Sequence, residues 1–119
     1  MKTIEQCVNV VDDPRLASYW PSERRAIIVH KYFLGVERGY GPTLEEAIAS
    51  WEERHAHTWR CEKMRRDAEA QLALIERHRE QLAREANRPV SFAEAARDWV
   101  QCHERAWRTA WEQSAVSGA

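Results

Sequence analysis

Hydrophobic and polar residues follow one another along most of this chain with the spacing of amphipathic α-helices. Alternation typical of a strand occurs near the start, at Val8, Val10 and Val11. Asp13 suits the cap of a short helical turn, and Pro21 suits the first position of a longer helix, where its missing N–H costs nothing. The pattern therefore predicts an all-α fold behind a short N-terminal arm.

Breaker and capping residues set the predicted helix boundaries. The first helix covers residues 21–38 and ends at a Gly-Tyr-Gly-Pro cluster. A second helix begins at Leu44 and meets neither Gly nor Pro before Ala86, so local propensity predicts one helix over residues 44–86. The last helix covers residues 92–113.

Two capping boxes mark the starts of the second and last helices. Thr43 with Glu46, and Ser91 with Glu94, have the spacing in which the hydroxyl accepts from an amide while the Glu side chain reaches back. Each box follows a breaker cluster. The sequence therefore contains two helix-turn-helix hairpins.

An internal repeat supports the two hairpins. Residues 27–60 align with residues 75–108 at a constant offset of 48, without gaps. A fixed internal period is a strong architectural signal. The identical pairs are Ile27/Ile75, His30/His78, Leu34/Leu82, Glu37/Glu85, Glu46/Glu94, Ala47/Ala95, Trp51/Trp99, His55/His103, Trp59/Trp107 and Arg60/Arg108.

One helical domain is expected to contain both repeats. Its predicted parts are an N-terminal arm (1–20), a first hairpin repeat (21–60), a connector helix (61–74), a second hairpin repeat (75–114) and a tail (115–119). The hairpins either share one long central helix or fold into a four-helix bundle through a kink near residues 60–64.

The composition argues against several classes of protein. The chain has 119 residues, of which 31% are charged and 44% hydrophobic, so it is long enough for a core and is not typical of disorder. Its net charge of −1 gives no overall attraction to nucleic acid or anionic lipid. Three scattered cysteines indicate a reducing compartment, and no apolar run is long enough for a membrane span. A cytoplasmic protein is expected.

The repeated aromatic residues are interpreted first as core. Trp51, His55 and Trp59 lie on one helical face, as do their counterparts Trp99, His103 and Trp107. A buried indole N–H needs an acceptor, and a His or Glu on the facing helix would provide one. This packing explains the repeat without a cofactor, so none is predicted.

A metal site is the alternative interpretation of the same residues. Two imidazoles and a carboxylate suit zinc or ferrous iron. The predicted ligands are His30, His55 and Glu37 in the first repeat and His78, His103 and Glu85 in the second.

Nucleic-acid binding is a second alternative, carried by the basic residues of the central helix. These are Arg60, Lys63, Arg65, Arg66, Arg77 and Arg79. Acidic residues interleave with them, whereas phosphate contact requires uncompensated positive charge. The pattern is therefore more typical of a salt-bridged helix surface than of a nucleic-acid-binding regulator.

The sequence shows none of the motifs typical of an enzyme. No nucleophile–base pair and no Gly-rich phosphate loop is visible, so an enzyme is not expected. A two-layer helical rod leaves apolar flanks that usually contact another surface. We expect a non-enzymatic interaction module, such as an adaptor, assembly factor or inhibitor, that binds a partner protein or forms a homodimer. Its candidate contact residues are Tyr19, Trp20, Tyr32, Phe33, Tyr40 and Trp111.

Overall fold

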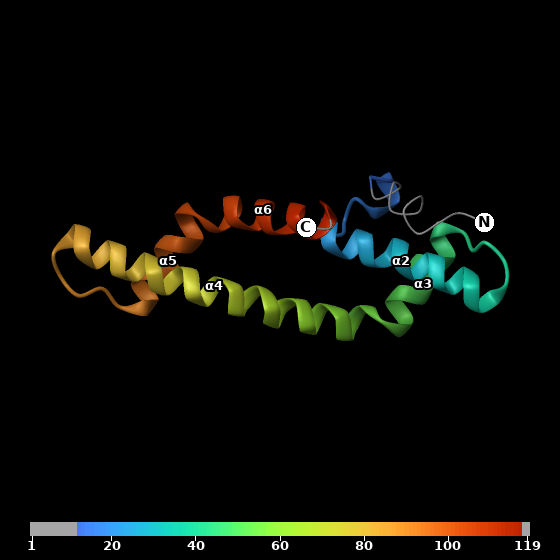
Figure 1. Cartoon of the computed structure of the whole chain (residues 1–119), viewed down its shortest axis with the longest axis horizontal. Coiled ribbons are helices and arrows are strands. Elements are labelled where there is room, and N and C mark those ends of the chain that lie inside the picture. Colours follow the sequence, from blue (N-terminus) through green and yellow to red (C-terminus); the bar gives the residue numbers. More distant parts are fainter. Residues whose placement is uncertain (1–11, 118–119) are drawn as a thin grey trace. The chain divides into compact units, whose positions relative to one another are not determined.

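The structure is a computed structural model that describes residues 12–117, and every regular element in this range is helical (Figure 1). The all-α prediction is confirmed, whereas the extended segment predicted at residues 8–11 lies outside the described residues. The elements are η1 (Pro14–Leu16), α2 (Pro21–Arg38), α3 (Leu44–Arg54), α4 (Ala56–Ala86), α5 (Phe92–Cys102) and α6 (Glu104–Ser117).

Contacts divide the chain into two compact units. Unit 1 comprises Met1–His57 with Trp111–Ala119, and unit 2 comprises Thr58–Ala110. Unit 1 contains the first hairpin, formed by α2 and α3. Unit 2 contains the second hairpin, formed by α5 and the part of α4 that follows His57. Within the described range, no helix combines the length and the hydropathy needed to cross a bilayer.

The hydroxyl caps of α3 and α5 are formed as predicted. Thr43 Oγ1 accepts a hydrogen bond from the Glu46 amide at 3.1 Å, and Ser91 Oγ accepts one from the Glu94 amide at 3.1 Å. In a capping box, the Glu side chain would also accept a bond from the N-cap amide. At Glu94 this bond is replaced by an ion pair, in which the carboxylate accepts two hydrogen bonds of 3.2 Å from Arg88. A guanidinium offers this carboxylate a stronger, bidentate partner than a backbone amide does.

Single histidines interrupt both long helices. The prediction of unbroken helices over residues 44–86 and 92–113 is therefore wrong. His55 has φ −131° and ψ −30°, and His103 has φ −129° and ψ −28°. In both, the backbone N–H still donates a hydrogen bond to the carbonyl of the tryptophan four residues earlier. No Gly or Pro lies at either position, so packing across the hairpin overrides local helix propensity.

Left-handed residues end the first helix of each hairpin. Gly39 has φ 77°, and its amide donates to the Gly35 carbonyl at 2.9 Å. Asn87, which lies 48 residues later, has φ 54°. Glycine adopts this conformation without steric cost, and asparagine tolerates it better than most residues.

Each unit has its own buried core. The buried hydrophobic residues of unit 1 are Leu16, Ile27, Ile28, Leu34, Leu44, Ala47, Trp51 and Ala56. In unit 2, Leu82, Ala83, Ala96 and Trp99 pack against the buried Ile75, Val90 and Ala95. Most of the repeated apolar positions are therefore core positions, as expected from the sequence.

A residue from the end of the chain caps α2. Trp20, at the N-cap position, makes no side-chain capping bond. The backbone amide of Ser22 instead donates to Glu112 Oε2 at 2.9 Å, and Glu112 is buried. A carboxylate at a helix N-terminus is favoured by the helix dipole as well as by the hydrogen bond.

The left-handed cap of α2 yields a stability prediction. Gly39→Ala should lower the free energy of unfolding by about 1 kcal/mol or more, because alanine is strained at positive φ. Urea denaturation followed by circular dichroism measures the change. Asn87→Gly is the matched control, and it should be neutral or stabilising. Equal stability of Gly39→Ala and the unmodified chain would contradict the prediction.

Candidate functional site

The first hairpin holds a cluster of aromatic and polar side chains, called the first cluster. The Trp51 indole N–H donates to Glu23 Oε2 at 2.9 Å, and both residues are buried. His30 Nε2 lies 2.9 Å from Ser50 Oγ. The His30 and His55 rings meet edge to face, with their centroids 4.7 Å apart. The cluster ties α2 to α3 by two side-chain hydrogen bonds and a ring contact.

The second hairpin holds the corresponding set, called the second cluster. The Trp99 indole N–H donates to Gln71 Oε1 at 3.0 Å. His78 Nε2 lies 2.5 Å from Asp98 Oδ2. The His78 and His103 rings meet edge to face at a centroid distance of 4.7 Å. The geometry is thus the same as in the first hairpin, while two of the five side chains differ.

Because of these two differences, the carboxylate occupies a different position in each cluster. Glu23 in the first cluster corresponds to Gln71 in the second, and Ser50 corresponds to Asp98. In the first cluster the carboxylate therefore accepts a hydrogen bond from the indole. In the second cluster the carboxylate pairs with the imidazole instead. The sequence predicted a His or Glu on the facing helix as the indole partner. Glu23 agrees with this prediction, whereas Gln71 does not.

The predicted metal ligands come together only in part. Each histidine pair is in ring contact, as described above. Glu37, however, pairs with Arg54 at 3.6 Å, and Glu85 accepts a hydrogen bond from Gln81 at 3.1 Å. Both carboxylates are exposed and satisfied by neighbouring side chains on the helix surface. Neither belongs to a metal-binding group in the described part of the chain.

A different carboxylate completes a candidate metal group in unit 2. The ligand atoms of His78, Asp98 and His103 all lie within 4.8 Å of one another. Among residues 12–117, this is the group of His, Cys, Asp or Glu side chains with metal-binding spacing. Asp98 is absent from the repeated identities, because its counterpart in the first hairpin is Ser50.

In the first cluster, His30 has positively charged neighbours. Burial lowers the pKa of His30, and the neighbouring His55, Arg54 and Arg38 lower it further, against an opposing contribution from Glu37. In the second hairpin, the positions corresponding to Arg54 and Arg38 are the uncharged Cys102 and Ala86.

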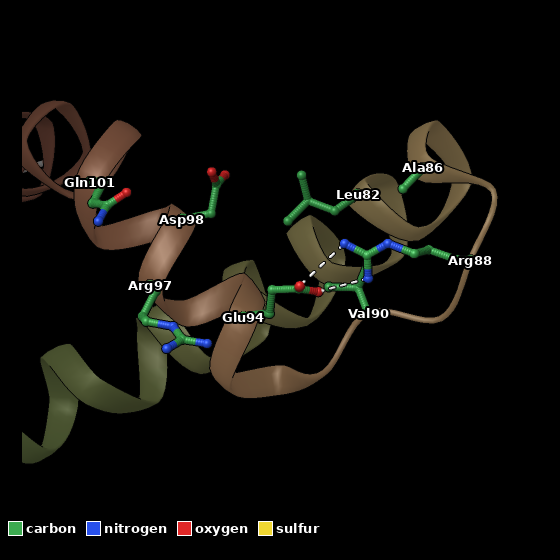
Figure 2. A pocket seen from close by; sticks show the side chains of 8 residues that line it. All are labelled: Leu82, Ala86, Arg88, Val90, Glu94, Arg97, Asp98 and Gln101. Atoms are coloured by element: carbon green, nitrogen blue, oxygen red, sulfur yellow. Dashed lines mark hydrogen bonds and ion pairs between the residues drawn. The ribbon is translucent and has the colours of Figure 1, made fainter.

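A hollow of about 360 Å³ lies beside Asp98. Figure 2 shows Arg88 paired with Glu94 across it, with Asp98 further along α5. The remaining lining residues are Leu82, Ala86, Val90, Arg97 and Gln101. The hollow gives solvent and small ions access to the region around Asp98.

The residues predicted for nucleic-acid binding differ in burial and in pairing. Lys63 is buried and donates to Asp67 at 2.7 Å, and Arg108 donates to the same carboxylate oxygen at 3.0 Å. Arg79 pairs with Glu76 at 3.0 Å. Arg65, Arg66 and Arg77 are exposed. Lys63 and Arg79 are therefore paired with carboxylates within unit 2.

The predicted partner-binding residues fall into two classes. Tyr19 and Tyr32 are partly buried, and the Tyr19 hydroxyl donates to Glu52 Oε1 at 2.7 Å. The exposed members are Trp20, Phe33, Tyr40 and Trp111.

Two of the exposed residues belong to a row on the first hairpin. Phe33, Val36 and Tyr40, called the α2 row, are 56%, 55% and 53% exposed. Phe33 and Val36 share one face of α2, because residues three apart on a helix do, and Tyr40 follows in the turn after Gly39. The corresponding positions of the second hairpin are Gln81, Arg84 and Arg88. Because the second hairpin has polar residues there, the hairpin fold does not require apolar ones.

Comparisons with known proteins do not add a relative. No protein-family model, no characterised protein and no solved structure matches this chain significantly.

The hydrogen bonds from the two indoles predict that the hairpins lose different amounts of stability when the bond is removed. Trp51→Phe should lower the free energy of unfolding by about 1–3 kcal/mol through the lost hydrogen bond, because the buried Glu23 carboxylate loses a donor. Trp99→Phe should cost less, because Gln71 is neutral and partly exposed to water. Denaturation of both variants measures the difference, and a larger loss for Trp99→Phe would overturn the interpretation.

The first cluster also predicts a dependence of stability on pH. Because burial lowers the pKa of His30, the folded chain binds this proton less well than the unfolded chain. The contribution of His30 is complete above the ordinary histidine pKa of about 6.5 and is lost as pH falls through the lowered folded value. An NMR titration should give a His30 midpoint below that of an unfolded peptide. His30→Gln should flatten the decline in stability, and a midpoint at or above the peptide value would refute the prediction.

Proposed function

We propose that this protein is a non-enzymatic interaction module that binds a partner protein through the α2 row. The supporting observation is the contrast between the hairpins. Phe33, Val36 and Tyr40 are exposed on the first, while the same positions on the second carry polar residues that also permit the fold. Exposed apolar groups that a fold does not need are most simply explained by contact with another molecule.

The row has the composition of an interface centre. Phe33 packs edge to face on Tyr32, with ring centroids 5.2 Å apart. Aromatic side chains supply large contact areas at low conformational cost and dominate binding energy at protein interfaces. An apolar helix face of this kind, here Phe33 and Val36 on α2 with Tyr40 in the turn that follows, fits an apolar groove or a second helix.

The neighbouring charges indicate the chemistry of the partner. Arg38 faces Glu46, and Glu37 faces Arg54, so charges beside the row already interact within the hairpin. A partner therefore gains little from opposite charge. We infer that it presents an apolar groove or helix face with weak electrostatic character.

A triple variant tests this function. Phe33→Gln, Val36→Arg and Tyr40→Arg together install the residues of the second hairpin. The fold should tolerate them, because the corresponding Arg88 pairs with Glu94 in the way that an arginine at position 40 can pair with Glu46. Loss of the row should weaken partner binding at least tenfold, since each anchor residue contributes about 1 kcal/mol or more.

Binding is measured by quantitative co-purification from the native host, followed by titration of the purified partner. Sedimentation shows whether the partner is a second copy of the 14.0 kDa chain. Met64→Gln with Leu72→Gln is the control, because it removes exposed apolar area from unit 2. The control should bind normally. A triple variant that retains its partners and its oligomeric mass would contradict the proposal.

A further inference from the structure

His78, Asp98 and His103 provide the ligand types of a transition-metal site. Their ligand atoms lie within 4.8 Å of one another. Ligands of one tetrahedral zinc ion lie about 3.4 Å apart, because each is about 2.0–2.1 Å from the metal. The approach needed is therefore about 1.4 Å at most, which side-chain rotation of the exposed His103 and the partly exposed Asp98 can supply. We propose that these residues, called the His2Asp site, bind a divalent transition-metal ion such as Zn²⁺.

The site is assembled from three parts of unit 2. His78 lies on α4, Asp98 on α5, and His103 at the interruption between α5 and α6. In an unbroken helix, residues five apart differ by about 140° around the axis. The non-helical backbone at His103 changes this direction. An ion held here would fasten α4 to the joint between α5 and α6.

Neighbouring side chains orient the ligands. The Trp99 ring lies 5.5 Å from the His103 ring and 6.1 Å from the His78 ring, centroid to centroid. The Cys102 thiol contacts Asp98 Oδ1 at 3.8 Å, while Oδ2 faces His78. Partners of this kind fix ligand orientation in metal sites. The Asp98 side chain is 39% exposed, which leaves room for water as a fourth ligand.

The first hairpin serves as an internal comparison. Its histidine rings have the same 4.7 Å separation, so ring pairing is a packing feature common to both hairpins. Ser50 stands where the second hairpin has Asp98, and a neutral hydroxyl is a poor ligand for zinc. Arg54 stands where the second hairpin has Cys102. The His2Asp site therefore differs from the first cluster in two ways. It has a carboxylate where the first cluster has a serine, and a cysteine where the first cluster has an arginine.

Metal binding would replace an existing hydrogen bond. Without an ion, the His78 Nε2–H group donates to Asp98 Oδ2. When the metal coordinates Nε2, that nitrogen gives its proton to solvent and Nδ1 takes one up, so that the ring stays neutral. The carboxylate then changes from hydrogen-bond acceptor to ligand. This exchange keeps both groups satisfied, because the ion takes the place of the proton between them.

Calorimetric titration of the full chain with Zn²⁺ tests the proposal. The unmodified protein should bind one ion per chain, and Co²⁺ should give the visible absorption of a tetrahedral site. Asp98→Ser should weaken zinc binding by about 100-fold or more, because loss of even an outer-shell partner costs about 10–100-fold. Asp98→Ser reproduces the arrangement of the first cluster, so the hairpin should still fold, as circular dichroism can verify.

A gain-of-site variant gives an independent test. Ser50→Asp with Arg54→Cys transfers the two distinguishing features to the first hairpin and should raise the stoichiometry to two ions. Cys61→Ser, at an exposed thiol outside the site, is the control and should leave binding unchanged. Absence of zinc binding to the unmodified chain, or equal affinity of Asp98→Ser, would overturn the proposal. The α2 row lies in unit 1, so this outcome is separate from that of partner binding.

Discussion

The hydrogen bond from a tryptophan indole to the facing helix is the constraint on which each hairpin depends. Trp51 reaches Glu23, and Trp99 reaches Gln71, in both cases across 28 residues of sequence. A large indole can be buried only if its N–H finds an acceptor, so the bond fixes which turns of the two helices lie opposite each other. Once this register is set, the histidine rings come into contact and the apolar residues beneath them close the core.

The sequence predicts the helices better than it predicts their partners. Pro21, Gly39, Thr43 and Ser91 mark boundaries that the structure reproduces, because capping and backbone conformation are local properties. The interruption at His55 has no local signal, since neither Gly nor Pro lies there. Tertiary contacts outweigh propensity in such cases.

The candidate site shows the same limit. Identical residues at the repeat distance correctly indicate the paired histidines, but they direct attention to Glu37 and Glu85, which turn to the helix surface. The residues that distinguish one cluster from the other, Ser50 and Asp98, are the ones that a search for identity discards. A shared scaffold needs its packing residues twice, whereas a ligand is needed only where it acts.

The cap of α2 by Glu112 links the beginning of the chain to its end. The Ser22 amide and the Glu112 carboxylate are 90 residues apart in sequence. During synthesis on the ribosome, the first hairpin can therefore form its own indole bond and core long before its N-terminus acquires this cap. The growing chain carries an incompletely satisfied helix end until residue 112 has been synthesised. Completion of unit 1 therefore depends on a segment that is made after all of unit 2, even though most of unit 1 is made first.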